Sequence, residues 1–149
     1  MIIRKYTLPD EEVIINLLRL NTPRYFAYEE EKDLKEYLKY CTRNYYVVEV
    51  GNKILGCGGF NISEDGTVGK ISWDIFHPGN QGKGYGTALT HFRIQKMKEI
   101  DGIEIISVRT SQLVYKFYEK FGLELREIIK DYWAPGFDLY RLDNVITSL

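Results

Sequence analysis

The sequence predicts a mixed α/β fold in which helices cover both faces of one sheet. Strand patterns and helical periodicities follow one another in the order β-α-α-β-β-β-α-β-α-β-β. The unit at 69–109 runs strand, helix, strand, so its two strands should be parallel with a right-handed crossover. Hairpins join the strands around this unit, which makes the sheet mixed. A chain of 149 residues with 44% apolar residues predicts a single domain spanning 1–149.

The first third of the chain reads as one strand followed by two helices. A strand is expected at 2–6, and Thr7 with Asp10 resembles a capping box before the first helix. The apolar positions of that helix are Val13, Ile14, Leu17 and Leu18. A second helix is expected at about 29–41, because Leu34, Tyr37, Leu38 and Cys41 are spaced i, i+3, i+4 and i+7.

The remaining two thirds read as six strands and two helices. The turn Gly51-Asn52 joins the first two of these strands into a hairpin, and Gly122 should end the last helix. The expected strands are 45–50, 53–62, 67–76, 103–109, 125–132 and 137–142, and the expected helices are 84–100 and about 114–121.

Composition excludes several classes of function. The net charge of −1 gives no reason to expect nucleic acid or an anionic membrane as a partner. The N-terminus lacks the apolar run of a signal peptide, and no stretch approaches the roughly 18 apolar residues of a membrane span. Cys41 and Cys57 have neither disulfide-scaffold density nor metal-site spacing. We therefore expect a cytoplasmic protein without a metal ion.

Residues 81–87, Gln-Gly-Lys-Gly-Tyr-Gly-Thr, are the most informative segment for function. They follow a strand and open a helix, an arrangement that aims backbone N–H groups and a helix dipole at an anion such as a diphosphate. A Walker loop is excluded because Gly84 follows Lys83. The glycine spacing and the mid-chain position disfavour a dinucleotide fingerprint. A plain turn without a ligand is the simplest alternative.

The segment Gln81–Gly86 matches the acetyl-CoA signature of the GCN5-related N-acetyltransferase (GNAT) superfamily, which is Gln or Arg, two residues, Gly, one residue, then Gly or Ala. Phe117–Leu123 resembles the tyrosine-bearing helix end of that family, at a fitting distance. The resemblance covers nearly the whole chain. It implies a largely antiparallel sheet of about seven strands with a splayed parallel pair, and an acyltransferase that moves an acetyl group from acetyl-CoA to a primary amine.

The resemblance also implies which residues bind the co-substrate acetyl-CoA. The pantetheine arm would pair with backbone groups of Ile75 and Phe76, and Ser111 stands where the family often has an asparagine that bonds this arm. The pyrophosphate would lie on the backbone N–H groups of Gln81, Gly82, Lys83, Gly84, Tyr85, Gly86 and Thr87.

Two residues are candidates for proton transfer. Tyr118 stands where the family's tyrosine commonly reaches the CoA sulfur and would act as the acid, although it could also simply pack in an apolar stripe. The family's usual glutamate is replaced by Lys70. Because side chains alternate along a strand, Asp74 is expected on the same face as Lys70, where it could serve as the base or be an ordinary strand carboxylate.

The acceptor is a small-molecule or peptide amine whose identity the sequence does not determine. Its site is expected at the connection 21–29, beside the acidic run Glu29-Glu30-Glu31, although acids at a helix N-terminus need no ligand. Oligomeric state is equally open, and the resembling family often forms homodimers. The first rival function is a non-catalytic CoA- or nucleotide-binding sensor, and the second is a dinucleotide-binding oxidoreductase domain.

Overall fold

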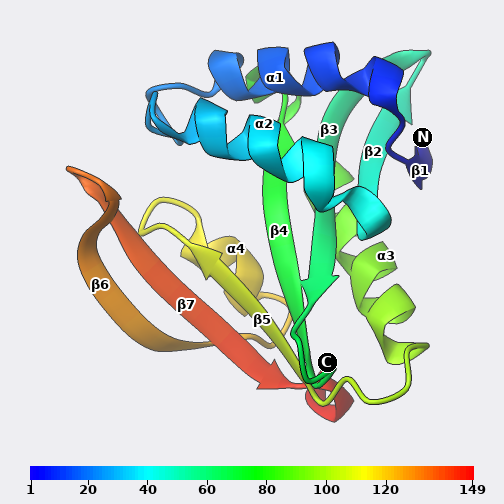
Figure 1. Ribbon diagram of the computed structural model, residues 1–149, viewed down its shortest axis with the longest axis vertical. Helices are drawn as coiled ribbons and strands as arrows, with labels where there is room; N and C mark the ends of the chain where they lie inside the picture. The colour runs from blue at the N-terminus through cyan, green and yellow to red at the C-terminus, as the bar shows by residue number, and fades with distance from the viewer. The chain divides into compact units, whose positions relative to one another are not determined.

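The computed structural model describes all residues from 1 to 149 and contains seven strands and four α-helices (Figure 1). In chain order they are β1 (Ile2–Lys5), α1 (Glu11–Leu20), α2 (Glu30–Tyr40), β2 (Tyr45–Val50), β3 (Lys53–Ile62), β4 (Val68–Phe76), α3 (Tyr85–Lys98), β5 (Ile105–Thr110), α4 (Tyr115–Glu119), β6 (Glu124–Ala134) and β7 (Phe137–Val145). Short 3₁₀ turns lie at 8–10, 42–44, 78–80 and 146–148. The expected order of strands and helices is confirmed.

The strands form one sheet in the order β1-β2-β3-β4-β5-β7-β6. The β4–β5 pair is parallel, whereas the β1–β2, β2–β3, β5–β7 and β6–β7 pairs are antiparallel. The parallel register runs only from Val68 opposite Ile105 to Ile71 opposite Val108. The expectation of a mixed, mostly antiparallel sheet with one parallel pair is confirmed.

The chain divides into two compact units, and the first comprises 1–59 and 73–92. One face of its strands packs against α1 and α2 because the apolar stripes of these helices meet the buried side chains of β2, β3 and β4. The opposite face meets α3, where the Tyr46 and Phe92 rings lie edge to face with centroids 5.0 Å apart. The core beneath α1 and α2 includes Ile14, Leu17, Leu18, Leu34, Leu38, Tyr45, Val47, Cys57 and Ile75.

The entry into α1 is fixed by a carboxylate. Asp10 accepts a hydrogen bond from the Thr7 backbone N–H at 2.8 Å, as the capping pattern predicts. Arg4 on β1 adds two hydrogen bonds of 2.9 Å to the two carboxylate oxygens of Asp10. This bidentate pair with Arg4 holds the pKa of Asp10 below its usual value, against the opposing effect of burial. The ion pair therefore ties the first strand to the first helix.

The second unit comprises 60–72 and 93–149. A side chain at Gly69 of β4 would overlap the Met97 sulfur of α3, so glycine lets helix and strand approach closely. Helix α4 ends at Glu119 with Lys120 as its C-cap, so the expectation that Gly122 ends this helix is wrong; Gly122 lies in the turn that follows, at φ +93°. Helix α4 is shorter than the predicted 114–121, whereas β7 is longer than the predicted 137–142 because Asp143 to Val145 pair with β5. None of the helices is both long and apolar enough to cross a membrane.

Candidate active site

The glycine-rich loop keeps two residues in a backbone conformation that other residues rarely adopt. Gly82 and Gly84 have φ angles of +81° and +83°. A Cβ at either position would have no atom within 4 Å, so steric crowding does not explain these glycines. Their positive φ explains them, because an L side chain is strained there. The loop backbone is also fully accessible on this side.

Helix α3 begins at Tyr85, directly after this loop. Its first hydrogen bond runs from the Ala88 N–H to the Gly84 carbonyl at 3.0 Å. The N–H groups of Tyr85, Gly86 and Thr87 therefore precede the first intrahelical donor and lie at the positive end of the helix dipole. Gln81 to Gly84 are exposed, so this end of the helix is open to solvent. Unpaired N–H groups at a helix N-terminus favour an anion.

Strand β4 carries an unexpected feature just before the loop. Trp73 has φ +50°, in the left-handed region, although it lies inside a strand and is not glycine. This bulge interrupts the alternation of side chains. Regular alternation therefore cannot be carried across Trp73, and the shared face of Lys70 and Asp74 stays a prediction. Asp74 is half-buried beyond the bulge.

The Tyr45 hydroxyl, which lies in the core, forms a hydrogen bond to the bulge at Trp73. Tyr45 is fully buried, and its Oη donates a hydrogen bond of 2.8 Å to the Trp73 carbonyl. Burial raises the pKa of Tyr45 well above its usual value, with smaller contributions from Cys57, Tyr37 and Asp74. The hydroxyl is therefore a permanent donor. Sequence reasoning missed this contact because residue 45 shows only an apolar strand pattern.

Asn21 holds the other end of the same strand segment. Its Nδ2 donates 2.8 Å to the Leu17 carbonyl of α1 and 2.9 Å to the Phe76 carbonyl of β4. The side chain is almost completely buried, so both hydrogen bonds are shielded from water. No local sequence signal pairs Asn21 with a residue 55 positions away.

Strand β3, which lies next to β4, has a glycine where the two strands approach closely. A side chain at Gly56 of β3 would overlap the Phe76 ring, so glycine makes room for that ring. Cys57 is fully buried, and its Sγ lies 3.7 Å from the Ile75 carbonyl, to which it donates. Cys57 is therefore a small side chain packed in the core.

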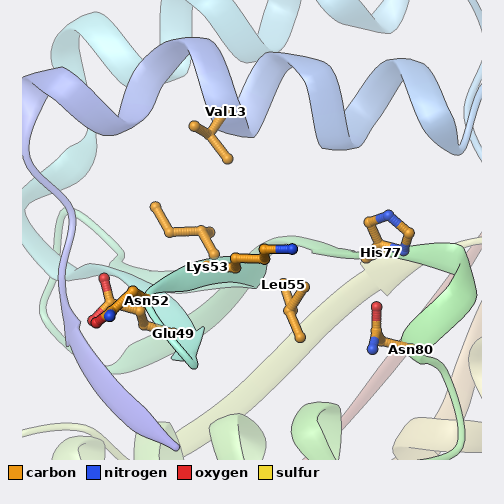
Figure 2. A pocket seen from close by; sticks show the side chains of 8 residues that line it. Val13, Glu49, Asn52, Lys53, Leu55, His77 and Asn80 are labelled. Carbon is orange, nitrogen blue, oxygen red and sulfur yellow. The ribbon is translucent and has the colours of Figure 1, made fainter.

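An open groove of about 620 Å³ flanks the start of the loop (Figure 2). Val13 of α1 lies on one side, Lys53 and Leu55 of β3 on the other, and His77 and Asn80 close one end. His77 Nδ1 accepts a hydrogen bond of 3.0 Å from the Gly79 N–H, which shapes the turn that leads into the loop. This contact supports a structural role for His77.

Tyr118 and Ser111 belong to the second unit, whereas Asp74, Ile75, Phe76 and the loop belong to the first. Tyr118 is nearly buried in α4 and lies edge to face with Phe117, with ring centroids 5.1 Å apart. The Ser111 Oγ accepts a hydrogen bond of 3.2 Å from the Leu113 N–H, so it shapes the turn before α4. The catalytic and cofactor-binding roles of these residues stay predictions.

The acidic run at the N-terminus of α2 has structural partners. Glu31 pairs with Arg19 and Lys35, and these hydrogen bonds lower its pKa to about 2. Glu30 accepts a hydrogen bond of 2.7 Å from the Ala27 N–H, and its partial burial raises its pKa. The structural interpretation of this run is therefore favoured at these two residues. Tyr28 and Glu29 stay exposed beside them.

Comparisons with known proteins give a consistent result. The model of the acetyltransferase (GNAT) family matches residues 14–123. An aminoglycoside 6'-N-acetyltransferase complexed with coenzyme A is 15% identical, with a TM-score of 0.79 and coverage of 98% of this chain and 97% of that chain. Ard1 from Thermoplasma volcanium is 14% identical, with a TM-score of 0.81 and coverage of 97% of this chain and 96% of that chain.

A third solved structure, a spermidine N-acetyltransferase chimera from Vibrio cholerae and hSSAT, is 20% identical, with a TM-score of 0.74 and coverage of 99% and 98%. At these identities the solved structures show a shared fold. No curated protein sequence matches the chain.

Proposed function

Because the chain belongs to the GNAT family of acetyltransferases, we propose that it transfers an acetyl group from acetyl-CoA to a primary amine by direct attack. The observation that carries this proposal is the loop at 81–87, where two glycines in the left-handed region lead into the N-terminus of α3. Backbone N–H groups at such a place bind the diphosphate of a nucleotide cofactor.

The transfer moves one acetyl group and one proton. The amine nitrogen forms a bond to the acetyl carbonyl carbon, the carbon–sulfur bond breaks, and the sulfur takes up a proton. In our proposal Tyr118 gives that proton and Asp74 accepts one from the amine, directly or through a water molecule. Ile75 and Phe76 pair with the pantetheine arm, and Ser111 adds a hydrogen bond to it.

The acceptor is proposed to be a small-molecule or peptide amine. Two of the similar solved structures are named for an aminoglycoside and for spermidine, and both names denote amines. Exposed Tyr28 and Glu29, at the connection between α1 and α2, offer an aromatic ring and a carboxylate for a cationic acceptor. We further propose a single cytoplasmic domain. In support of this, Cys41 and Cys57 are not joined in a disulfide. A homodimer is the alternative to a monomer.

A thiol-release assay tests the proposed function. Purified protein is incubated with acetyl-CoA and a panel of polyamines, aminoglycosides, amino acids and peptides, and free CoA thiol is measured against time. We expect release that depends on one class of amine and saturates with it. Binding of acetyl-CoA without release for any amine would favour the non-catalytic sensor instead.

A further inference from the structure

We propose that Tyr45 is a positioning residue for acetyl transfer, because its hydroxyl fixes the main chain of β4 beside the thioester. The inference rests on the proposed function. Its structural basis is the hydrogen bond of 2.8 Å from the Tyr45 Oη to the Trp73 carbonyl, at the point where the backbone of β4 leaves regular strand geometry. Tyr45 is fully buried and touches no substrate, so it acts through the strand.

The backbone conformation at Trp73 needs a partner to persist. A bulky residue at φ +50° is strained, and such residues survive only where the surroundings fix them. The indole is packed by the Phe26 ring, stacked at 6.2 Å, and by the Tyr37 ring at 6.3 Å. Packing fixes the side chain, whereas the Tyr45 hydroxyl fixes the carbonyl. These two contacts together determine the orientation of the peptide group between Trp73 and Asp74.

The position of Tyr45 is itself determined by its neighbours. A Cβ at Gly59, the register partner of Tyr45, would lie 2.6 Å from the ring atom Cδ1 of Tyr45, so glycine makes room for the ring. Tyr37 and Tyr6 contact the ring edge to face at centroid distances of 5.4 Å and 6.0 Å. The hydroxyl is therefore held in one place and does not follow the strand if the strand moves.

The hydrogen bond orients more than one atom. In a trans peptide the carbonyl of Trp73 and the N–H of Asp74 lie in one plane and point in opposite directions. Fixing the carbonyl thus fixes this plane and the direction in which Asp74, Ile75 and Phe76 continue. Asn21 holds the Phe76 carbonyl at 2.9 Å, so the segment 73–76 is held at both ends. This is the segment that we propose to carry the pantetheine arm and the base.

Removing the Tyr45 hydroxyl should therefore impair turnover more than binding. The diphosphate contacts at 81–87 do not involve Tyr45, and Asn21 still holds the Phe76 carbonyl beside the pantetheine arm, so the affinity for CoA should fall less than kcat does. A small displacement of groups beside a reacting centre reduces turnover strongly, and we expect kcat to fall about 10- to 100-fold in Tyr45→Phe. A purely structural role would lower the melting temperature and leave kcat of the folded protein unchanged.

Tyr6→Phe is the matched control. The Tyr6 hydroxyl is buried in the same aromatic cluster and has no hydrogen-bond partner. Both variants lose one buried oxygen and keep the ring. We expect Tyr6→Phe to keep wild-type kcat, and the amide NMR resonances of Trp73 and Asp74 to shift in Tyr45→Phe only.

The experiment measures kcat and KM for acetyl-CoA by thiol release, CoA affinity by calorimetry, and amide resonances by NMR in all three proteins. A kcat of Tyr45→Phe within twofold of wild type, or an equal fall in Tyr6→Phe, overturns the proposal. Unmoved resonances of Trp73 and Asp74 overturn it as well. Should wild type bind CoA but transfer no acetyl group, the proposed function fails, whereas the NMR comparison still tests the effect of Tyr45 on β4.

Discussion

Replacing Gly84 by alanine should weaken CoA binding by straining the backbone of the loop. Gly84 has φ +83°, and an added Cβ would have no atom within 4 Å. The cost is therefore conformational, about 1–2 kcal/mol for an L-residue in the left-handed region. The loop relieves this strain by moving its N–H groups out of the conformation that meets the diphosphate. A loss of that size in binding corresponds to an affinity about 5- to 30-fold lower.

Isothermal titration calorimetry with CoA measures this loss, and Gly66→Ala is the control. Gly66 has φ +77° and equally open surroundings, but it lies in the turn between β3 and β4. Both variants should lose similar thermal stability, and only Gly84→Ala should lose affinity. The reasoning is refuted if Gly84→Ala binds CoA within twofold of wild type, or if Gly66→Ala loses as much affinity.

Three further substitutions test the proposed chemistry and the fold. Tyr118→Phe should lower kcat about 100-fold and change KM for acetyl-CoA little; unchanged turnover in the thiol-release assay removes Tyr118 from the mechanism. Asp74→Asn should shift the acidic limb of the pH–rate profile, and an unshifted profile excludes Asp74 as the base. The pKa of the Asp10 carboxyl is lower in the folded protein than in the unfolded chain. The ion pair with Arg4 therefore stabilises the fold fully at pH values above the unfolded-chain pKa. This stability is lost as the pH falls through the pKa of the folded protein. Urea unfolding of Asp10→Asn should accordingly depend less on pH between about 4 and 2 than that of wild type, and equal dependence would contradict this account.

The parts of the fold that local chemistry encodes could be predicted from the sequence. Period-two and period-3.6 patterns placed the strands and helices, and the β2–β3 hairpin was placed to the residue because Gly51-Asn52 adopts positive φ at both turn positions. The loop was predictable for the same reason. Its glycines mark positive φ, and the helix that follows supplies the N–H groups.

The features that depend on tertiary contacts could not be predicted. The left-handed backbone at Trp73 has no local signal, because it is held by Tyr45, 28 residues earlier in the chain. The Asn21–Phe76 hydrogen bond likewise joins residues that only the packing of α1 on the sheet brings together. For this reason regular alternation does not determine how Asp74 lies relative to Lys70. The acidic run could be interpreted either way until the Arg19, Lys35 and Ala27 contacts were known.

The most direct test of the central claim compares CoA with pantetheine by calorimetry on the wild-type protein. Pantetheine has the same thiol arm and lacks the diphosphate and the nucleotide. If the N–H groups from Gln81 to Thr87 bind the diphosphate, CoA should bind saturably and at least about tenfold more tightly than pantetheine. No heat with CoA on a well-folded sample, or equal affinity for the two compounds, would contradict the account.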